Sequence, residues 1–304
     1  MSALRIESSS HGIVRTGTVS LLALAVAAGC AAPAPEATGN LADGPYHILV
    51  TNDDGIASPG IRELADALRE VGEVTVVAPC GQRSGASMSV TLGQGKRLRH
   101  VSDENRDLGY CVDGTPADAV MLALEAFTPE GGFDLVVSGI NAGANVGDLG
   151  HMSGTVGAAM AGAYRGVPSV AASLGGDEMD FAYPAAFMAR FVEELQRRPA
   201  DPGVVLSVNF PAATEDAVAG VAIGRMGGSY IHFGYEEVGP EDGIRVFRPQ
   251  FTPADAHPPE SDTEAYMQGM ITIAPLRFDW TDVGMLGELV GWELDHRLEG
   301  APES

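Results

Sequence analysis

The sequence has few cysteines, few aromatic residues and little positive charge, and each shortage excludes a class of protein. Three cysteines in 304 residues cannot form the framework of a small disulfide-rich scaffold. Only 18 basic residues, with Lys96 the single lysine, oppose 41 acidic ones, giving a formal net charge of −23. A nucleic-acid duplex is a poor partner for such a chain, because phosphate binding needs clustered Lys and Arg. Long apolar runs are missing too, since residues 19–28 fall well short of the ~20 that span a bilayer.

What remains is the composition of a globular protein with a real core. Hydrophobic residues make up 45% of the chain, which excludes a disordered polypeptide. The length suits one large α/β domain or two small ones. Internal repeats are absent from the sequence.

Residues 1–30 have the features of an export signal. The short apolar run 19–28 ends in Ala27-Ala28-Gly29-Cys30, and small residues before a single cysteine resemble the lipobox of bacterial lipoproteins. We therefore expect a lipid on Cys30 and a flexible tether over 31–44. The expected location is the periplasm or cell surface, with membrane contact only through the lipid anchor. The alternative is a cytoplasmic protein whose first residues are not native.

Strand-like and helix-like segments alternate along the rest of the chain. This pattern favours a three-layer α/β fold with a Rossmann-like, mostly parallel sheet covered on both faces. Residues 225–265 interrupt the alternation with five prolines and many acids, so we expect an excursion from the main sheet there. Strands are expected over 47–50, 73–78, 134–137, 168–173, 204–209 and 270–276, and helices over 61–71, 154–162, 181–197 and 285–297.

Three of the expected strands end in polar loops instead of neutral turns. These loops are 52–55, 81–89 and 138–147. In an open parallel sheet, ligands bind beyond the carboxyl ends of the strands. Paired carboxylates with hydroxyl and amide oxygens suit Mg²⁺, Mn²⁺ or Ca²⁺ better than zinc. Asp53-Asp54-Gly55 alone is also a common turn, but three oxygen-rich loops at one edge favour a metal site.

Other motifs narrow the chemistry further. Ser153-Gly154-Thr155 precedes an expected helix, whose free backbone N–H groups favour an anion such as phosphate. The sequence has no GxxxxGK[ST], which excludes a Walker-type NTPase, and no GxGxxG between a strand and a helix. A GxSxG nucleophile elbow is also absent. His151 and His232 are isolated, and a lone histidine is more often structural than catalytic.

The run from Ile48 to Leu92 resembles the start of the SurE family, the stationary-phase survival proteins. The similarity continues to about residue 285. Its later motifs are Gly114–Asp118, Val137–Asn145, Ser153–Val156, Val208–Pro211 and Ile271–Leu276. One departure is Cys80, where the family usually has Asp.

The resemblance implies a metal-dependent phosphomonoesterase, a 5′-nucleotidase that is also acid-phosphatase-like. Family members hydrolyse nucleoside 5′-monophosphates, often 3′-monophosphates as well, and some act on short polyphosphate. Their fold is Rossmann-like, with a C-terminal hairpin exchanged between subunits of a homodimer or homotetramer. We therefore expect a SurE-like domain over 45–300, in which 225–265 forms an extended hairpin that serves oligomerisation, and one divalent metal ion, Mg²⁺ or Mn²⁺.

Site residues follow by matching motifs. The expected metal ligands are Asp53, Asp54, Ser84 and Asn141, of which the two aspartates are also the candidate catalytic residues. The candidate substrate-binding residues are Asn52, Gly85, Asn145, Ser153, Gly154 and Thr155. Two mechanisms remain open: attack by water with an aspartate as proton acceptor, and an aspartyl-phosphate intermediate. A non-catalytic solute-binding lipoprotein for phosphorylated ligands is the alternative function.

Two cysteines remain once Cys30 is lipidated. An exported protein folds where a close pair of thiols becomes oxidised. Cys80 ends the second expected strand, and Cys111 lies just before Gly114 on what the resemblance indicates is the same face. A bridge needs Cα atoms within about 7 Å, so both a disulfide and two separate thiols stay open at this stage.

Overall fold

The computed structural model describes residues 44–93, 95–103, 106–177 and 179–292. The predicted signal peptide (1–30), its lipidation site Cys30 and all but the last residue of the tether (31–44) lie outside these ranges. Across the described ranges, every helix is too short or too polar to cross a bilayer.

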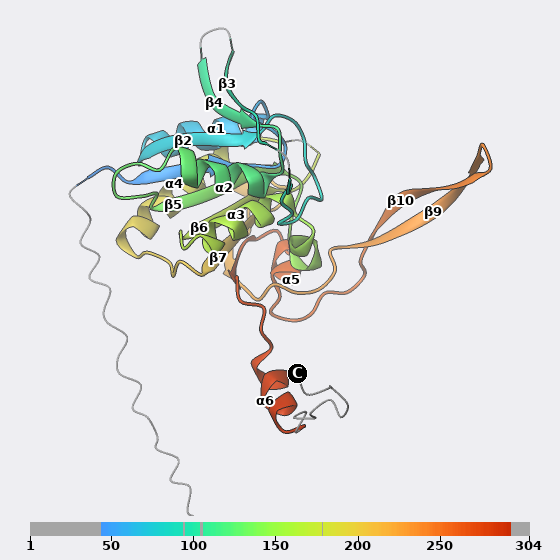
Figure 1. Ribbon diagram of the computed structural model, residues 1–304. Helices are drawn as coiled ribbons and strands as arrows, with labels where there is room; N and C mark the ends of the chain where they lie inside the picture. Colours follow the sequence, from blue (N-terminus) through green and yellow to red (C-terminus); the bar gives the residue numbers. More distant parts are fainter. Residues whose placement is uncertain (1–43, 94, 104–105, 178, 293–304) are drawn as a thin grey trace, which may run out of the picture. The chain divides into compact units, whose positions relative to one another are not determined.

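A nine-stranded sheet forms the centre of the fold (Figure 1). Its strand order is β3-β4-β2-β1-β5-β6-β7-β11-β8. The five neighbouring strands from β2 to β7 run parallel to one another. The strands are β1 (His47–Thr51), β2 (Glu73–Pro79), β3 (Leu98–Asp103), β4 (Arg106–Val112), β5 (Leu135–Ala142), β6 (Ser169–Leu174), β7 (Val204–Phe210), β8 (Val221–Ile223) and β11 (Ile271–Arg277).

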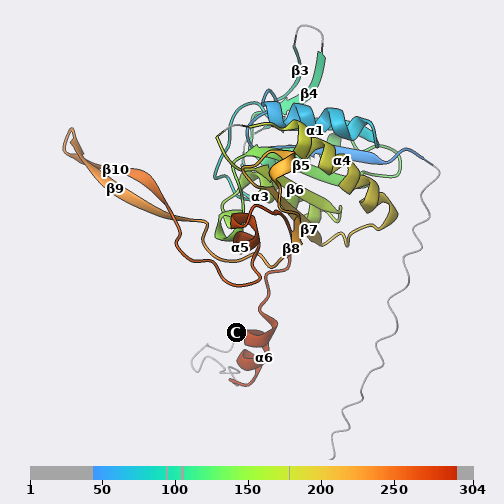
Figure 2. The same cartoon turned by 180° about the vertical axis from the view of Figure 1, so that it is seen from behind.

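Helices cover both faces of the sheet. α2 and α3 pack together over one face (Figure 1), and α1 and α4 pack together over the other (Figure 2). This arrangement confirms the predicted three-layer α/β fold. The helices are α1 (Pro59–Arg69), α2 (Pro116–Ala126), α3 (Gly154–Tyr164), α4 (Ala182–Arg197), α5 (Asp262–Met267) and α6 (Val283–Val290), with short 3₁₀ turns at Gly147–His151 and Glu215–Ala217.

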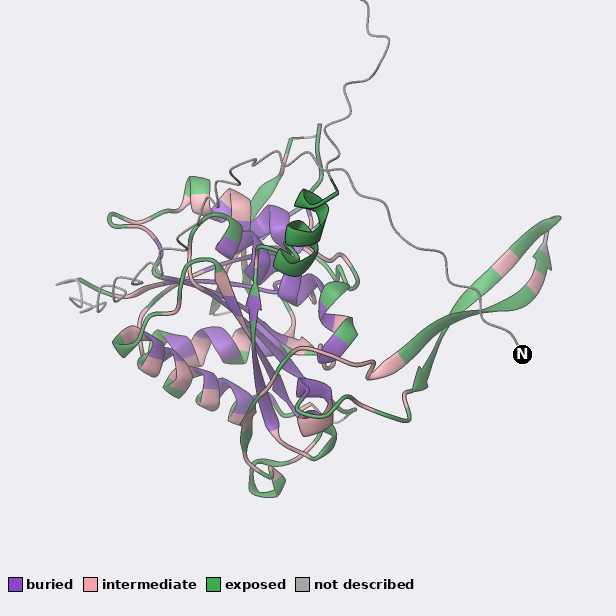
Figure 3. Ribbon diagram, turned by 90° about the horizontal axis from the view of Figure 1, so that it is seen from below, coloured by how far each residue is buried: buried purple, intermediate pink, exposed green. Residues whose placement is uncertain are grey.

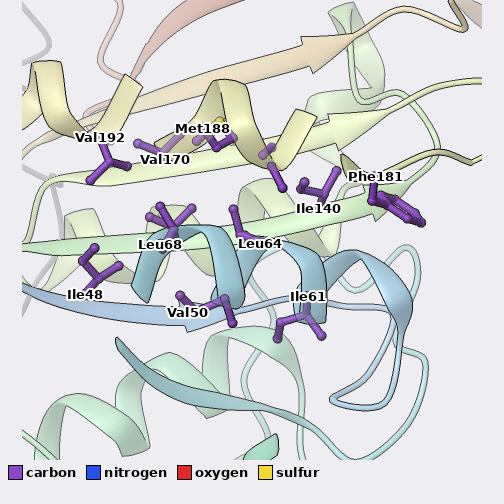
Figure 4. Close-up of a cluster of buried hydrophobic side chains, with 14 of the residues drawn as sticks. Ile48, Val50, Ile61, Leu64, Leu68, Ile140, Val170, Phe181, Met188 and Val192 are labelled. Atoms are coloured by element: carbon purple, nitrogen blue, oxygen red, sulfur yellow. The ribbon is translucent and has the colours of Figure 1, made fainter. Parts of the chain in front are cut away.

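The alternation of side chains along β1 explains the two cores. Ile48 and Val50 point to the face covered by α1 and α4, whereas Leu49 belongs to the cluster under α2 and α3. On α1, Ile61, Leu64 and other residues at helical spacing pack onto the first face (Figure 4). All the residues of β5 up to Ile140 are buried, as expected for a strand covered on both sides (Figure 3).

The structure corrects several predicted elements. α2 and the β3–β4 pair were not anticipated, because α2 is apolar on most sides and β3 is almost wholly exposed, so neither shows a clear period. β11 runs antiparallel to β7, and β3 runs antiparallel to β4, so the sheet is parallel only in its centre. The closing helix was predicted to continue to residue 297, but α6 already ends at Val290. Residues 293–297 of the predicted helix lie outside the described ranges.

Within residues 225–265 the chain leaves the main sheet. β9 (Ile231–Glu241) and β10 (Ile244–Pro253) pair with each other as a separate antiparallel sheet. Aromatic side chains on this hairpin are exposed, among them Tyr235 at 66% and Phe251 at 58%. The described hairpin therefore offers apolar surface that the rest of this chain leaves uncovered.

Cys80 and Cys111 form a disulfide. Their Cα atoms are 4.7 Å apart, and the Cys80 N–H also donates to the Val112 carbonyl at 3.0 Å. Of the two alternatives left open by the sequence, the structure has the bridge. It ties the end of β2 to β4, at the start of the loop that carries Ser84.

Candidate metal and phosphate site

The strand order places a topological switch point at the carboxyl end of β1. The chain passes from β1 to β2 on one side, and β5 lies on the other side of β1. At such a switch point the connecting segments leave the sheet in opposite directions, which opens a site beyond the strand ends. Asp53 and Asp54 follow β1, Ser84 follows β2, and Asn141 lies at the end of β5. The predicted metal ligands therefore all come from segments at the carboxyl ends of β1, β2 and β5.

Asp53 is held against the start of α3. Its Oδ1 accepts a hydrogen bond from the Thr155 hydroxyl at 2.6 Å. A Cβ placed on Gly154 would lie 2.7 Å from Asp53 Oδ2, so only glycine lets the helix start approach this carboxylate. Burial raises the pKa of Asp53, the Thr155 hydroxyl lowers it, and the neighbouring Asp54 raises it again. The side chain is only 3% exposed.

Asp54 connects the same loop to β5. Its Oδ2 accepts the Ala142 N–H at 2.9 Å. Burial raises the pKa of Asp54, while this N–H and the Gln82 side chain lower it. Asn141 lies next to that contact, and its Nδ2 donates to the Gly143 carbonyl at 2.7 Å, which leaves Oδ1 as the acceptor end of the amide.

The loop that carries Ser84 is anchored at the preceding residue. The Arg83 N–H donates to the Asp53 carbonyl at 2.7 Å, and Arg83 Nε donates to the Gly114 carbonyl at 3.1 Å. Gly55 and Gly81 are also in close contact, because a Cβ on Gly55 would lie 3.1 Å from the Gly81 backbone. These contacts bring the Ser84 loop against the two aspartates.

The donor set fits a hard divalent cation. In the described ranges, neither Asp53 nor Asp54 has a Lys, Arg or His within ion-pair distance. Two adjacent desolvated carboxylates without a cation are costly, and binding a metal ion removes that cost. In the described part of the chain, no group of three or more His, Cys, Asp or Glu side chains forms a competing metal site. Carboxylate, hydroxyl and amide oxygens are the set that Mg²⁺ and Mn²⁺ accept.

The candidate phosphate side lies at the start of α3. Ser153 is the N-cap residue, and its Oγ accepts the Val156 N–H at 3.1 Å. Asn145 is held by two contacts: its N–H donates to Asn209 Oδ1 at 2.7 Å, and its Nδ2 donates to Ser173 Oγ at 2.8 Å. The Thr155 hydroxyl is already engaged by Asp53, so the group that Thr155 offers to an anion is its backbone N–H.

Two further candidate residues have other surroundings. Asn52 is fully buried, and its side chain holds the turn that follows β1 through the Gly55 carbonyl, the Gly55 N–H and Ser58 Oγ. Gly85 is exposed, with a positive φ of 72° and open space around its Cα. The geometry thus gives Asn52 a turn-holding role and leaves Gly85 exposed in the loop that follows β2.

Sequence reasoning missed the residues that support the site. Asn209 and Ser173 orient Asn145 from β7 and β6. The Val208–Pro211 motif drew attention to Asn209, but only as part of a family pattern. Two cavities of about 340 and 540 Å³ are present in the described structure, and none of the predicted metal ligands lines either one.

Fold and site together define a doubly wound α/β protein with an oxygen-ligand site at the switch point of its parallel sheet. This architecture is shared by many proteins of different function, so the class alone does not identify the chain. The chain belongs to the Survival protein SurE family, whose family model matches residues 48–232.

The similarity to known proteins covers most of this chain and nearly the whole length of each relative. The 5′-nucleotidase SurE of Chlorobaculum tepidum is 37% identical over 259 residues, covering 83% of this chain and 97% of that protein. The 5′-nucleotidase SurE of Mannheimia succiniciproducens is 38% identical over 250 residues, covering 81% and 98%. The crystal structure of the SurE protein from Aquifex aeolicus matches with a TM-score of 0.72 and 31% identity, covering 81% of this chain and 99% of that one.

Proposed function

We propose that this chain is a metal-dependent phosphomonoesterase that hydrolyses nucleoside 5′-monophosphates, and also 3′-monophosphates, to nucleoside and phosphate. One observation carries the proposal: the Thr155–Asp53 hydrogen bond joins a pair of adjacent carboxylates, Asp53 buried and Asp54 partly buried, to the N-terminus of a helix. That arrangement sets groups that bind a cation beside groups that bind an anion. The printed activity of the similar proteins, 5′-nucleotidase, matches this chemistry.

Asp53, Asp54, Ser84 and Asn141 would hold one Mg²⁺ or Mn²⁺. Such an ion supplies positive charge to the phosphoryl group and to the attacking water. The N–H groups of Gly154 and Thr155 at the start of α3 bind the phosphoryl oxygens and stabilise the negative charge that grows on them. Either aspartate can accept the proton of the attacking water, and the Thr155 hydroxyl keeps Asp53 in one orientation for this role.

The decisive experiment measures phosphate release by the full chain from a panel of nucleoside 5′- and 3′-monophosphates. We expect turnover with added Mg²⁺ or Mn²⁺, loss of turnover with a chelator, and recovery when the metal is restored. Stoichiometric nucleotide binding without phosphate release would instead identify a solute-binding protein. Hydrolysis of an isotopically chiral thiophosphoryl substrate in ¹⁸O water then separates the two mechanisms, because a single in-line attack by water inverts the configuration at phosphorus, whereas two successive displacements through an aspartyl-phosphate retain it.

The location proposed is outside the cytoplasm, as a lipoprotein anchored through Cys30. The sequence supports it with the short apolar run 19–28 and the small residues before Cys30. The Cys80–Cys111 disulfide is a second, independent support, because structural disulfides persist in oxidising compartments. Fractionation tests the proposal: wild-type protein found in the cytosol with residues 1–30 intact would refute it, and Cys30→Ser should abolish lipid attachment.

We also propose a homodimer or homotetramer assembled through the β9–β10 hairpin. The support is the exposed aromatic surface of the hairpin, including Phe233 and Phe251, together with α6, none of whose residues is buried within the described structure. The mass of the protein measured by light scattering tests this. Replacing Phe233 and Phe251 by serine should shift the mass toward that of one chain, and a wild-type mass equal to one chain would refute the proposal.

A further inference from the structure

Asp262 is a buried carboxylate that lies outside all the residues assigned so far. It is the first residue of α5, and its exposed fraction is 1%. Its carboxylate has no Lys, Arg or His within ion-pair distance in the ranges that the structure describes. A buried charge is costly unless hydrogen bonds satisfy it, so the partners of this carboxylate indicate why it is there.

Those partners are backbone N–H groups from two distant segments and from the next residue in the chain. Asp262 Oδ2 accepts the Gly147 N–H at 3.1 Å. Asp262 Oδ1 accepts the Gly227 N–H at 3.0 Å and the Thr263 N–H at 2.9 Å. One oxygen therefore holds the 3₁₀ turn Gly147–His151, and the other holds residues 225–229, which we call the hairpin stem because they lead into β9.

Other contacts close the same junction. The Asp148 N–H donates to the Gly228 carbonyl at 2.9 Å, and Ser229 Oγ donates to Asp148 Oδ2 at 2.8 Å. A Cβ on Gly147 would lie 2.0 Å from the Gly228 oxygen, so the two backbones approach closely enough to require glycine. The hairpin stem is thus fixed directly to the turn, with the Asp262 carboxylate between them.

The 3₁₀ turn Gly147–His151 leads directly into the start of α3, where the proposed phosphate-binding groups lie. Gly147 lies between Asn145 and Ser153, the two ends of the proposed phosphate-binding segment. The Ser153 N–H donates to the Leu149 carbonyl at 3.1 Å, which makes the turn continuous with the N-cap of α3. Displacing Gly147 would therefore shift the free N–H groups of α3 relative to Asp53.

We propose that Asp262 is a positioning residue that sets the phosphate-binding segment 145–153 and couples it to the hairpin stem. The proposal rests on the proposed function, because that function identifies 145–153 as the segment that binds the phosphoryl group. Asp262 touches neither metal nor substrate. Its carboxylate fixes the backbone segment that binds the phosphoryl group.

Asp262→Asn isolates this role. In the favoured orientation the amide oxygen keeps the two N–H groups bound by Oδ1, and the NH₂ group faces the Gly147 N–H, donor against donor. The variant therefore releases the turn but keeps the stem. We expect the dissociation constant of inorganic phosphate and the KM for nucleotide to rise about 10- to 100-fold, as for losses of residues that orient ligands. Mn²⁺ affinity, measured by titration, should stay within about 2-fold, because the metal ligands lie on other segments.

Two results would overturn the proposal. One is an unchanged phosphate affinity in Asp262→Asn. The other is a loss of Mn²⁺ affinity as large as the loss of phosphate affinity, together with a lower melting temperature, which would indicate a general structural role. Asp134→Asn is the control, since Asp134 accepts the His47 N–H at the amino ends of β1 and β5, away from the site, and should leave all three values unchanged.

A second variant applies if Asp262→Asn does not fold. Ser229→Ala removes only the hydrogen bond to Asp148, and it should raise the phosphate dissociation constant in the same direction by a smaller factor. An unchanged value in this variant would then refute the coupling. If wild-type protein releases no phosphate from nucleotides, the proposed function fails, whereas phosphate and Mn²⁺ binding still decide the role of Asp262.

Discussion

The Cys80–Cys111 disulfide allows a quantitative test of how the Ser84 loop is held. The bridge joins residues separated by 31 positions, and in the chain-entropy treatment a loop of this length contributes about 3.7 kcal/mol to stability at 25 °C. Replacing both cysteines by alanine removes the bridge with little change in polarity. Because Cys111 is only 4% exposed, the variant also leaves a small cavity. We therefore expect the free energy of unfolding to fall by about 3–4 kcal/mol.

Urea unfolding of three samples measures this value. Wild-type protein, wild-type protein with thiol reductant and the double alanine variant are compared under the same conditions. The reductant should destabilise the wild type nearly as much as the double substitution does, and it should leave the variant unaffected. A loss below about 1 kcal/mol in both comparisons would refute the reasoning, since it would mean that the bridge constrains neither the unfolded chain nor the loop.

Three further predictions concern the site and its surroundings. Asp53→Asn and Asp54→Asn should each lower turnover by at least ~100-fold while the circular dichroism spectrum is retained, and a near-normal rate in either variant would remove that residue from the site. Thr155→Val deletes the hydroxyl that binds Asp53, so kcat/KM should fall about 10- to 100-fold with little change in melting temperature; unchanged kinetics would mean that this bond does not matter for catalysis. Burial raises the pKa of Asp118, but hydrogen bonds, above all from Lys96, hold it below its ordinary value, so the pair stabilises the fold above about pH 4 and that contribution is lost as the pH falls further. Lys96→Met should therefore lower the free energy of unfolding at pH 7, and its difference from wild type should shrink below pH 4; a constant difference would contradict this.

The central strands and helices could be predicted because their patterns are determined locally. β1 is a short, continuously buried apolar run, α1 carries buried residues at helical spacing, and polar residues mark where each ends. The β3–β4 pair and α2 lack such periods. Their positions depend on contacts with β2 and with α3 that no short window of sequence contains.

The same division holds for the site. Loops at one edge of a parallel sheet could be predicted to converge, because strand direction fixes which ends meet. The partners of the functional groups could not. Thr155 and Asp53 are 102 positions apart, and Gly147 and Asp262 are 115 apart. Such pairs depend on how two segments pack in three dimensions, and the many acids of residues 225–265 gave no sign that one of them is buried.

The central position of β1 has a consequence for how activity and folding are related. β1 lies fourth from the β3 edge of the nine-stranded sheet, paired on both sides, and carries Asp53 and Asp54 at its end. Backbone amides of such strands open to hydrogen exchange only when the whole domain unfolds. Fraying of the edge strands β3 and β8 therefore leaves the carboxylate pair in place. Catalytic activity that is retained in a damaged or partly digested sample then indicates that the core of the sheet is intact.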